Sequence, residues 1–389
     1  MTINVEVAQA LVTAGYVSDA DVEAAASVLA DTLVVKAARD AVAEALAGEA
    51  YQEGLIADAE AMADLDAEMG AYEDEEIDME TIHTLPELPL EAWEQSKITL
   101  HLYMQIVGKI RLKASPRKNH WWYITLYICP KGFTTHAIPY DDGFQTFEIT
   151  FNLIDHQLEV VTSQGDSGAI ALEDGLSVAQ FYQELIAMLQ EFGIAVSILD
   201  KSYDVPDIED APFAEITDYA SYQKEYVERF WRIMMWVDGV FKEFSGRSYA
   251  KTSPVNLYWH HLDLAVTRFS GKKGPDLAPE MRISDKDAYS HEVISFGFWA
   301  GDPIVRGAAF YSYTFPSPDG LDKEPLQPTA AQWVDSNGSP MAVLMYDDLR
   351  TQTNPRQVLL EFLESAYQAG AKLANWDIEA MTVPPLTEL

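Results

Sequence analysis

The strongest constraint on the fold of this chain is the strict alternation of apolar and polar side chains from Thr146 to Leu153. Neighbouring residues of a strand point to opposite faces, so this pattern predicts a strand with one buried and one solvated face. Such strands are typical of antiparallel sheets, because parallel sheets are usually covered on both faces. The alternation therefore favours an antiparallel sheet over a parallel, doubly wound one.

The same order of elements is predicted twice along the chain. In the first half, periodicity predicts a helix over 92–112 and strands over 120–129, 146–153 and 157–163. A second helix over 177–193 and a further strand over 194–199 follow. The second half gives a helix, strands and a final helix, over 222–244, 255–269, 289–299, 307–315, 331–335, 341–345 and 355–376. We therefore predict an α+β fold of two related lobes, each with helix, antiparallel sheet and helix.

Local signals support several of these boundaries. Ser177 and Gln180 form the pattern of a capping box at the start of a helix. Asn354 followed by Pro355 is typical of a helix N-terminus, and Asn337-Gly338 is typical of a two-residue hairpin turn.

Changes in composition predict the domain boundaries. Residues 1–84 form an acidic region and linker, 85–199 the first lobe, and 221–389 the second lobe. The acidic segment 200–220, with Pro206 and Pro212, separates the lobes. Loops of this composition usually run over the surface, so we expect it to be an exposed linker.

The N-terminal region differs from the rest of the chain. Residues 1–80 hold 20 acidic residues against only Lys36 and Arg39, and they lack tryptophan, phenylalanine and proline. Their alanine-rich stripes predict a small all-α region that ends in an acidic linker over 71–80. The region is either a solubilising appendage or an arm that binds a basic protein partner.

The net charge narrows the classes of partner. A formal charge of −36 repels phosphate backbones and anionic lipids, which argues against direct binding of nucleic acid or membranes. The single cysteine, Cys129, excludes an intramolecular disulfide and favours a reducing compartment. With no basic leader and no apolar run long enough to span a bilayer, the chain is predicted to be cytoplasmic.

The stretch from Ser253 to Gly271 concentrates side chains capable of chemistry. Its aromatic and β-branched residues predict a strand that carries His260, His261, Asp263 and Arg268. His261 and Asp263 either orient an imidazole or hold a metal, or they are plain surface residues. On a regular strand Asp263 and Arg268 point to opposite faces, and Arg268 is the predicted contact for a small anionic ligand.

Familiar catalytic motifs are incomplete in this sequence. His291 to Ser295 starts like the zinc-protease motif HExxH but lacks the second histidine. Gly165 to Gly168 reads GDSG, which the flanking strands explain as a tight turn. The chain has no G-x-G-x-x-G, P-loop or C-x-x-C motif, so we predict no cofactor and no metal.

A polar stripe crosses the first predicted helix of the body. His101, Gln105 and Lys109 stand four residues apart, so they share one face of a helix that is otherwise apolar. The stripe faces either water or a cleft.

Several motifs together resemble one known family. The stretches LPLEAW, TLHLYMQIVGKIRL, NHWW, SPVNLYW, DLAVTRFSG, AYSHEVISFGFW and AAFYSYTFP are similar to a bacterial family known as a domain of unknown function, DUF5996, over residues 85–378. The resemblance implies a domain and no mechanism. The polar and tryptophan positions that match its motifs are His101, Gln105, Lys109, His120, Trp121, Trp122, Asp263, Arg268, Ser290, His291 and Glu292.

Two functions remain open from the sequence. Buried charges need partners, so the matching residues form either a structural network or a ligand cleft with aromatic walls from Trp121 and Trp122. The first hypothesis is a binding or interaction protein with an acidic arm. The second is an enzyme in which His291 and Glu292, or His120, act as acid and base on an anionic substrate.

Overall fold

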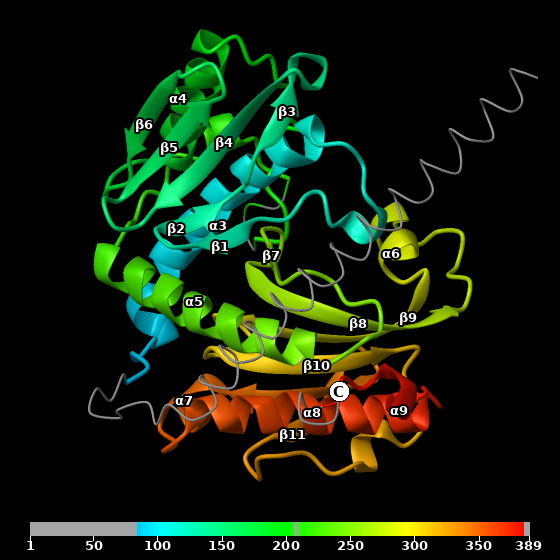
Figure 1. The fold of residues 1–389 in the computed structure, drawn as a ribbon. Helices are drawn as coiled ribbons and strands as arrows, with labels where there is room; N and C mark the ends of the chain where they lie inside the picture. Colours follow the sequence, from blue (N-terminus) through cyan, green and yellow to red (C-terminus); the bar gives the residue numbers. More distant parts are fainter. Residues whose placement is uncertain (1–83, 206–207, 209, 385–389) are drawn as a thin grey trace, which may run out of the picture. The chain divides into compact units, whose positions relative to one another are not determined.

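The computed structural model of the protein describes residues 84–205, 208 and 210–384 (Figure 1). It confirms the α+β fold, with two antiparallel sheets of six strands each. The predictions for residues 1–83 lie outside the described residues. None of the helices in the described part of the chain has the length and apolarity needed to cross a membrane.

The first lobe consists of two long helices and a six-stranded sheet. Its elements are α3 (Leu90–Ala114), η2 (Asn119–Trp121), β1 (Tyr127–Cys129), β2 (Gly132–Thr134), β3 (Ile138–Tyr140), η3 (Asp141–Gly143), β4 (Gln145–Asn152), β5 (Gln157–Thr162), β6 (Ser167–Ala171) and α4 (Val178–Glu191). The strands follow the order β1-β2-β4-β5-β6, and β3 pairs with the start of β4. In β4 the predicted apolar positions Phe147, Ile149 and Phe151 are buried. Thr150 and Asn152 on the opposite face are buried as well, so only the first half of the strand has the predicted partly exposed face.

The second lobe also consists of a long helix, a six-stranded sheet and a second long helix, with shorter helices between them. Its elements are α5 (Lys224–Gly246), β7 (Asn256–Tyr258), β8 (Asp263–Lys273), α6 (Ile283–Ala288), β9 (His291–Trp299), β10 (Ala309–Phe315), η5 (Leu321–Lys323), β11 (Gln332–Ser336), β12 (Ser339–Met345), α7 (Tyr346–Arg350), α8 (Pro355–Leu373) and α9 (Ile378–Met381). The sheet order is β11-β12-β10-β9-β8-β7. Helices α5 and α8 pack on one face of this sheet, which we call the inner face, and the opposite face is the outer face (Figure 1).

The predicted helix and hairpin signals are confirmed. The Ser177 hydroxyl accepts a hydrogen bond from the Gln180 amide, and the Gln180 side chain accepts one from the Ser177 amide. The Asn354 side chain caps α8 ahead of Pro355. Asn337 and Gly338 connect β11 to β12 with φ angles of 54° and 83°, the left-handed pair that this turn needs.

The two lobes meet edge to edge at their first strands. Leu126 and Leu257 exchange two backbone hydrogen bonds of 2.9 Å each. Beside them, the Thr125 hydroxyl donates to Asn256 Oδ1 at 3.0 Å. The first strand of each lobe therefore lies at the edge of its own sheet, next to the first strand of the other lobe.

The predicted strand over 120–129 is wrong in its first part. His120 and Trp121 have left-handed φ angles of 54° and 62°, and only Tyr127–Cys129 is a strand. The cause is tertiary, because the 119–122 turn packs on the second lobe. The His120 ring lies 4.6 Å from the Phe269 ring between centroids, and Trp121 Nε1 donates to the Ser284 carbonyl at 3.1 Å.

The predicted strand over 255–269 is in fact two strands. A turn over residues 259–262, with Leu262 at φ 54°, separates β7 from β8. The turn forms because Trp259 leaves the sheet and packs against α3. Local propensity for a strand is overridden by this contact.

The segment between the lobes is exposed in part, as at Lys201, Asp204 and Asp210, but other side chains anchor it to the body. No strand forms over 194–199. Beyond it, Ser202, Val205, Phe213 and Ile216 are buried, Phe213 within the short helix η4 (Phe213–Glu215). The segment is held close because polar side chains of α3 bind its backbone, as described below.

Candidate functional site: a cleft on the second sheet

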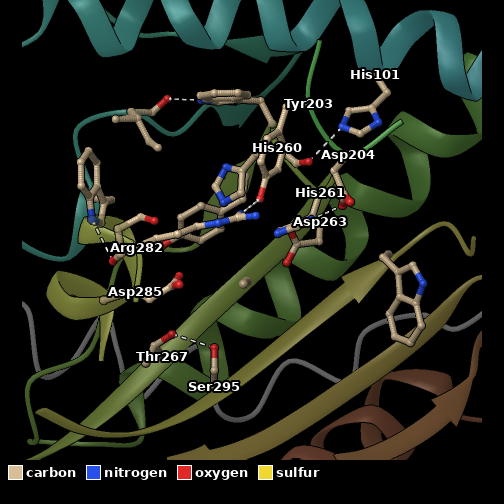
Figure 2. Close-up of a pocket in the computed structure, with 18 of the residues that line it drawn as sticks. His101, Tyr203, Asp204, His260, His261, Asp263, Thr267, Arg282, Asp285 and Ser295 are labelled. Carbon is tan, nitrogen blue, oxygen red and sulfur yellow. Dashed lines mark hydrogen bonds and ion pairs between the residues drawn. The ribbon is translucent and has the colours of Figure 1, made fainter. Parts of the chain in front are cut away.

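A large cavity lies between the lobes, over the outer face of the second sheet (Figure 2). Its volume is about 1880 Å³, and its walls come from α3, the 112–124 and 197–205 segments, and the region around α6. Pockets for small molecules usually measure roughly 300–1,000 Å³. A small ligand would therefore fill only part of this space, which we call the cleft.

Strand register arranges the cleft floor in rows. Residues directly opposite each other in an antiparallel sheet share a face. One row runs across three strands as Tyr258, Asp263 and Trp299. The next contains Ala265, Gly297 and Tyr311, and the one after it Thr267, Ser295 and Tyr313. The outer face thus carries carboxylate, hydroxyl and aromatic groups, whereas the inner-face residues between them are mostly apolar and buried.

Gly297 positions the most important contact of the floor. A Cβ atom at Gly297 would lie 2.3 Å from the end of the Tyr311 ring, so only glycine leaves room for that ring over β9. The ring therefore reaches from β10 across to β8, where the Tyr311 hydroxyl donates to Asp263 Oδ2 at 2.6 Å. The other carboxylate oxygen, Oδ1, is buried and has no hydrogen-bond partner.

Hydroxyl pairs occupy the neighbouring part of the floor. The Thr267 and Ser295 hydroxyls lie 2.9 Å apart, and those of Tyr289 and Tyr313 lie 3.2 Å apart. Each pair leaves lone pairs and hydrogens that a ligand can use, since a hydroxyl offers one donor and two acceptor positions. The floor can thus bind both donors and acceptors.

The turn between β7 and β8 is fixed by α3. The Trp259 ring packs where a Cβ at Gly108 would lie 2.2 Å away, and Trp259 Nε1 donates to the Ile124 carbonyl at 2.9 Å. His101 Nε2 lies 3.2 Å from the His260 carbonyl. The same nitrogen lies 3.2 Å from the Gln105 side-chain nitrogen, so His101 contacts both the 259–262 turn and its neighbour on α3. These contacts hold His260 and His261 at the side of the cleft.

The 199–205 segment forms the opposite side. Gln105 exchanges two hydrogen bonds with the backbone of Tyr203, at 2.7 and 2.9 Å, and Lys109 Nζ donates to the Lys201 carbonyl at 2.6 Å. Asp204, on this segment, binds His261 Nδ1 at 2.9 Å (Figure 2). The predicted polar stripe of α3 therefore fixes a chain segment, which is a third role beside the two considered from the sequence.

Asp204, not Asp263, is the carboxylate that orients His261. The Asp204 and His261 side chains are each about half exposed, so the pair lies at the cleft mouth. Within the residues that the structure describes, no group of three or more His, Cys, Asp or Glu side chains is placed to hold a metal ion.

Burial controls the ionisation of the groups around the cleft. Desolvation raises the pKa of Asp263, although the Tyr311 hydrogen bond acts in the opposite direction. Desolvation also raises the pKa of Tyr311 and Tyr313 well above the ordinary range, so both remain neutral. The same effect lowers the pKa of His101 and of His260 to about 3 each, so both imidazoles are neutral at physiological pH.

The structure brings most of the predicted ligand residues to the cleft. Its walls or floor include Asp263, His101, Lys109, His120, Trp121 and Trp122. Gln105 is completely buried behind the wall. The sequence therefore located the elements around the cleft, although several of these side chains serve to hold its walls.

Arg268, the predicted anion contact, lies on the other side of the sheet. Its guanidinium packs between two aromatic rings, 3.6 Å from the Phe244 centroid and 4.4 Å from the Tyr367 centroid. It also donates to the Phe244 carbonyl, and only 2% of the residue is exposed. Arg268 stands five positions after Asp263 on β8, so when Asp263 faces the cleft, Arg268 must face the helices.

The three predicted acid–base residues are not free in the cleft. Glu292 faces the inner side, where it accepts hydrogen bonds from Ser270 at 2.8 Å and Trp376 at 3.0 Å. His291 is not among the residues that line the cleft. His120 does line it, but its Nδ1 lies 3.1 Å from the Asp287 carbonyl and its Nε2 lies 2.7 Å from Lys251 Nζ, so both ring nitrogens are occupied.

Several floor residues were missed from the sequence. Tyr311, Tyr313, Gly297, Thr267 and Ser295 stand on alternate positions of three neighbouring strands. The two tyrosines of AAFYSYTF stand two positions apart, which was a signal that they share one face of a strand. What the sequence could not give is the pairing of these strands, which places the positions side by side.

Comparisons with known proteins agree with the resemblance seen in the sequence. The sequence model of a family of unknown function, DUF5996, matches residues 85–383. No curated protein and no solved structure matches the chain. Because the match covers both lobes and most of the chain, the protein belongs to the DUF5996 family.

Proposed function

We propose that the two-lobed body binds a small organic molecule in the cleft. The observation that carries this proposal is the contrast between the two faces of the second sheet. The outer face presents Asp263, Thr267 and Ser295 together with tyrosine and tryptophan rings, and these line a cavity instead of packing into a core. Ligand sites typically combine aromatic walls with a few convergent polar groups.

The walls support binding because they are held by specific contacts. The wall segments 199–205 and 259–262 are each tied to α3 through side-chain hydrogen bonds. A site whose walls are fixed before binding loses less conformational entropy when the ligand enters. The cleft thus resembles a preformed site more than a gap left by imperfect packing.

The test is a thermal-shift screen of small metabolites on three proteins. Thr267→Phe fills the floor from a partly exposed position, and Thr162→Phe makes the same change on a first-lobe strand away from the cleft. We expect compounds that stabilise the wild type and Thr162→Phe but not Thr267→Phe. If every stabilising compound acts equally on all three proteins, the cleft is not the binding site.

A second candidate function is acid–base catalysis on the bound molecule. It is favoured by the 2.9 Å contact between Asp204 and His261 Nδ1 at the cleft mouth, because a carboxylate in this position orients an imidazole for proton transfer. The bound compounds from the screen can be followed by NMR for chemical conversion. Conversion that persists in both Asp204→Asn and His261→Asn would rule out this pair as the catalytic one.

The acidic N-terminal region remains a separate proposal. Residues 1–84, whose charge suits a basic protein surface, are proposed to bind a protein partner. A pull-down with the full chain and with a chain that starts at Leu85 tests it. Equal capture of the same partners by both chains would exclude this role.

A further inference from the structure

The Asp263 carboxylate stands within a group of aromatic rings. Tyr258 and Trp299 are its direct neighbours in the first row of the floor. Tyr311 binds it from β10, 5.5 Å from the Trp299 ring between centroids, and Tyr313 stacks on Tyr311 at 6.2 Å. We call Asp263 with Tyr258, Trp299, Tyr311 and Tyr313 the Asp263 box.

Electrostatic attraction from His261 favours the ionised form of this carboxylate, but no ion pair between described residues neutralises it. Asp263 is 9% exposed and lines the cleft. It takes part in no ion pair formed between described residues, and Oδ1 lacks a hydrogen-bond partner. A buried carboxylate is costly to ionise without a cation, so a positively charged group that entered the box would gain more there than in water.

Two lysines elsewhere on the cleft walls, Lys97 and Lys109, are already engaged. Lys97 donates to the Gly301 carbonyl, and Lys109 donates to the carbonyls of Leu199 and Lys201. These lysines hold backbone segments in place, and each would have to release its carbonyl to bind an anionic ligand. The box, in contrast, can bind a ligand cation without breaking a contact of this kind.

We propose that the Asp263 box binds the protonated amine of a small organic ligand. This inference rests on the proposed function, because it assigns the ligand class to the same cleft. The carboxylate supplies the countercharge and accepts the N–H donors, and the negative faces of the tyrosine and tryptophan rings stabilise the cation. A sugar-like polyol could donate to the carboxylate but would leave its charge uncompensated, and an anion would be repelled.

The experiment compares three probes of similar shape: 2-phenylethylamine, its neutral counterpart 2-phenylethanol, and the anion phenylacetate. Binding to the full chain is measured by ligand-observed NMR and by tryptophan fluorescence at neutral pH. We expect the amine to bind at least tenfold more tightly than the alcohol, and phenylacetate to bind more weakly than either. In Asp263→Asn the affinity for the amine should fall to that for the alcohol. The affinity for the alcohol should be the same in the variant and the wild type.

Control variants distinguish three explanations for a loss of amine binding: a wrong ligand class, a wrong binding site, and a misfolded protein. Asp238→Asn removes a buried carboxylate of α5 that is not part of the cleft, and it should leave amine binding unchanged. If Asp263→Asn does not fold, Asp263→Ser takes its place. If the alcohol or phenylacetate binds more tightly than the amine, the amine proposal is overturned. If that binding is also lost in Thr267→Phe, the cleft remains a ligand site. Binding of none of the probes, or amine binding that survives the loss of Asp263, would also overturn it.

Discussion

Replacing His101 by glutamine should remove part of the pH dependence of stability that the wild-type protein has. His101 is 9% exposed, and burial lowers its pKa to about 3 in the folded protein. In the unfolded chain the same imidazole titrates near the ordinary value of about 6.5. Between these two values the unfolded state binds a proton that the folded state does not, so the free energy of unfolding falls as the pH is lowered.

The size of the effect follows from the unfolded-state pKa alone. As long as the folded imidazole stays neutral, a drop to pH 5 favours the unfolded state by about 1.4 kcal/mol for each pH unit below 6.5, or about 2 kcal/mol in total. This contribution is absent above pH 7.5. The stability difference between the wild type and His101→Gln should therefore change by about 2 kcal/mol between pH 8 and pH 5.

The assay is urea unfolding at four pH values, followed by tryptophan fluorescence. The many acidic groups of the chain also titrate in this range, but they contribute equally to both proteins and cancel in the difference. His136→Gln is the control: partial burial also lowers the pKa of His136, but this histidine is largely exposed, so its removal should change the pH slope less. Parallel pH curves for the wild type and His101→Gln would refute the neutral, buried state of His101.

The remaining predictions concern the floor, the inner face and the N-terminal region. Gly297→Ala should displace the Tyr311 ring and lower the free energy of unfolding by about 1–3 kcal/mol. Gly239→Ala, where a Cβ meets no atom, should not destabilise the protein. Equal urea midpoints for the two variants would contradict the role of Gly297. Arg268→Ala should lower the free energy of unfolding by about 2–4 kcal/mol because it empties a buried space. Arg268→Met refills most of that space and should be less destabilising. An unchanged melting temperature for Arg268→Ala would contradict this packing. A chain that starts at Leu85 should retain the melting temperature of the body, and its unfolding or insolubility would show that residues 1–84 are not separable.

The order of elements could be predicted because its signals are local. The capping box at Ser177 and the Asn337-Gly338 turn depend on residues close in sequence, and both are confirmed. Burial of the apolar positions of β4 is confirmed as well. The failures occur where distant contacts decide the backbone. Trp259 leaves its predicted strand to pack at Gly108, and the 119–122 turn follows its contacts with the second lobe.

The candidate site could be predicted only in part, for a related reason. Alternation along β8 showed that Asp263 and Arg268 point to opposite faces, but not which face borders the cleft. That choice depends on where α5 and α8 pack, and these helices cover the face that carries Arg268. The link from Tyr311 to Asp263 depends on a missing side chain at Gly297, which no pattern within one strand reveals.

A crystal structure of the protein soaked with 2-phenylethylamine tests the central claim most directly. The account predicts that the ammonium nitrogen lies within about 3 Å of an Asp263 carboxylate oxygen, the distance of a charge-assisted hydrogen bond. The phenyl ring should lie in the cleft beside Tyr311 and Trp299. Density for the amine elsewhere on the protein, or its nitrogen pointing away from Asp263, would contradict the assignment of the Asp263 box as the cation site.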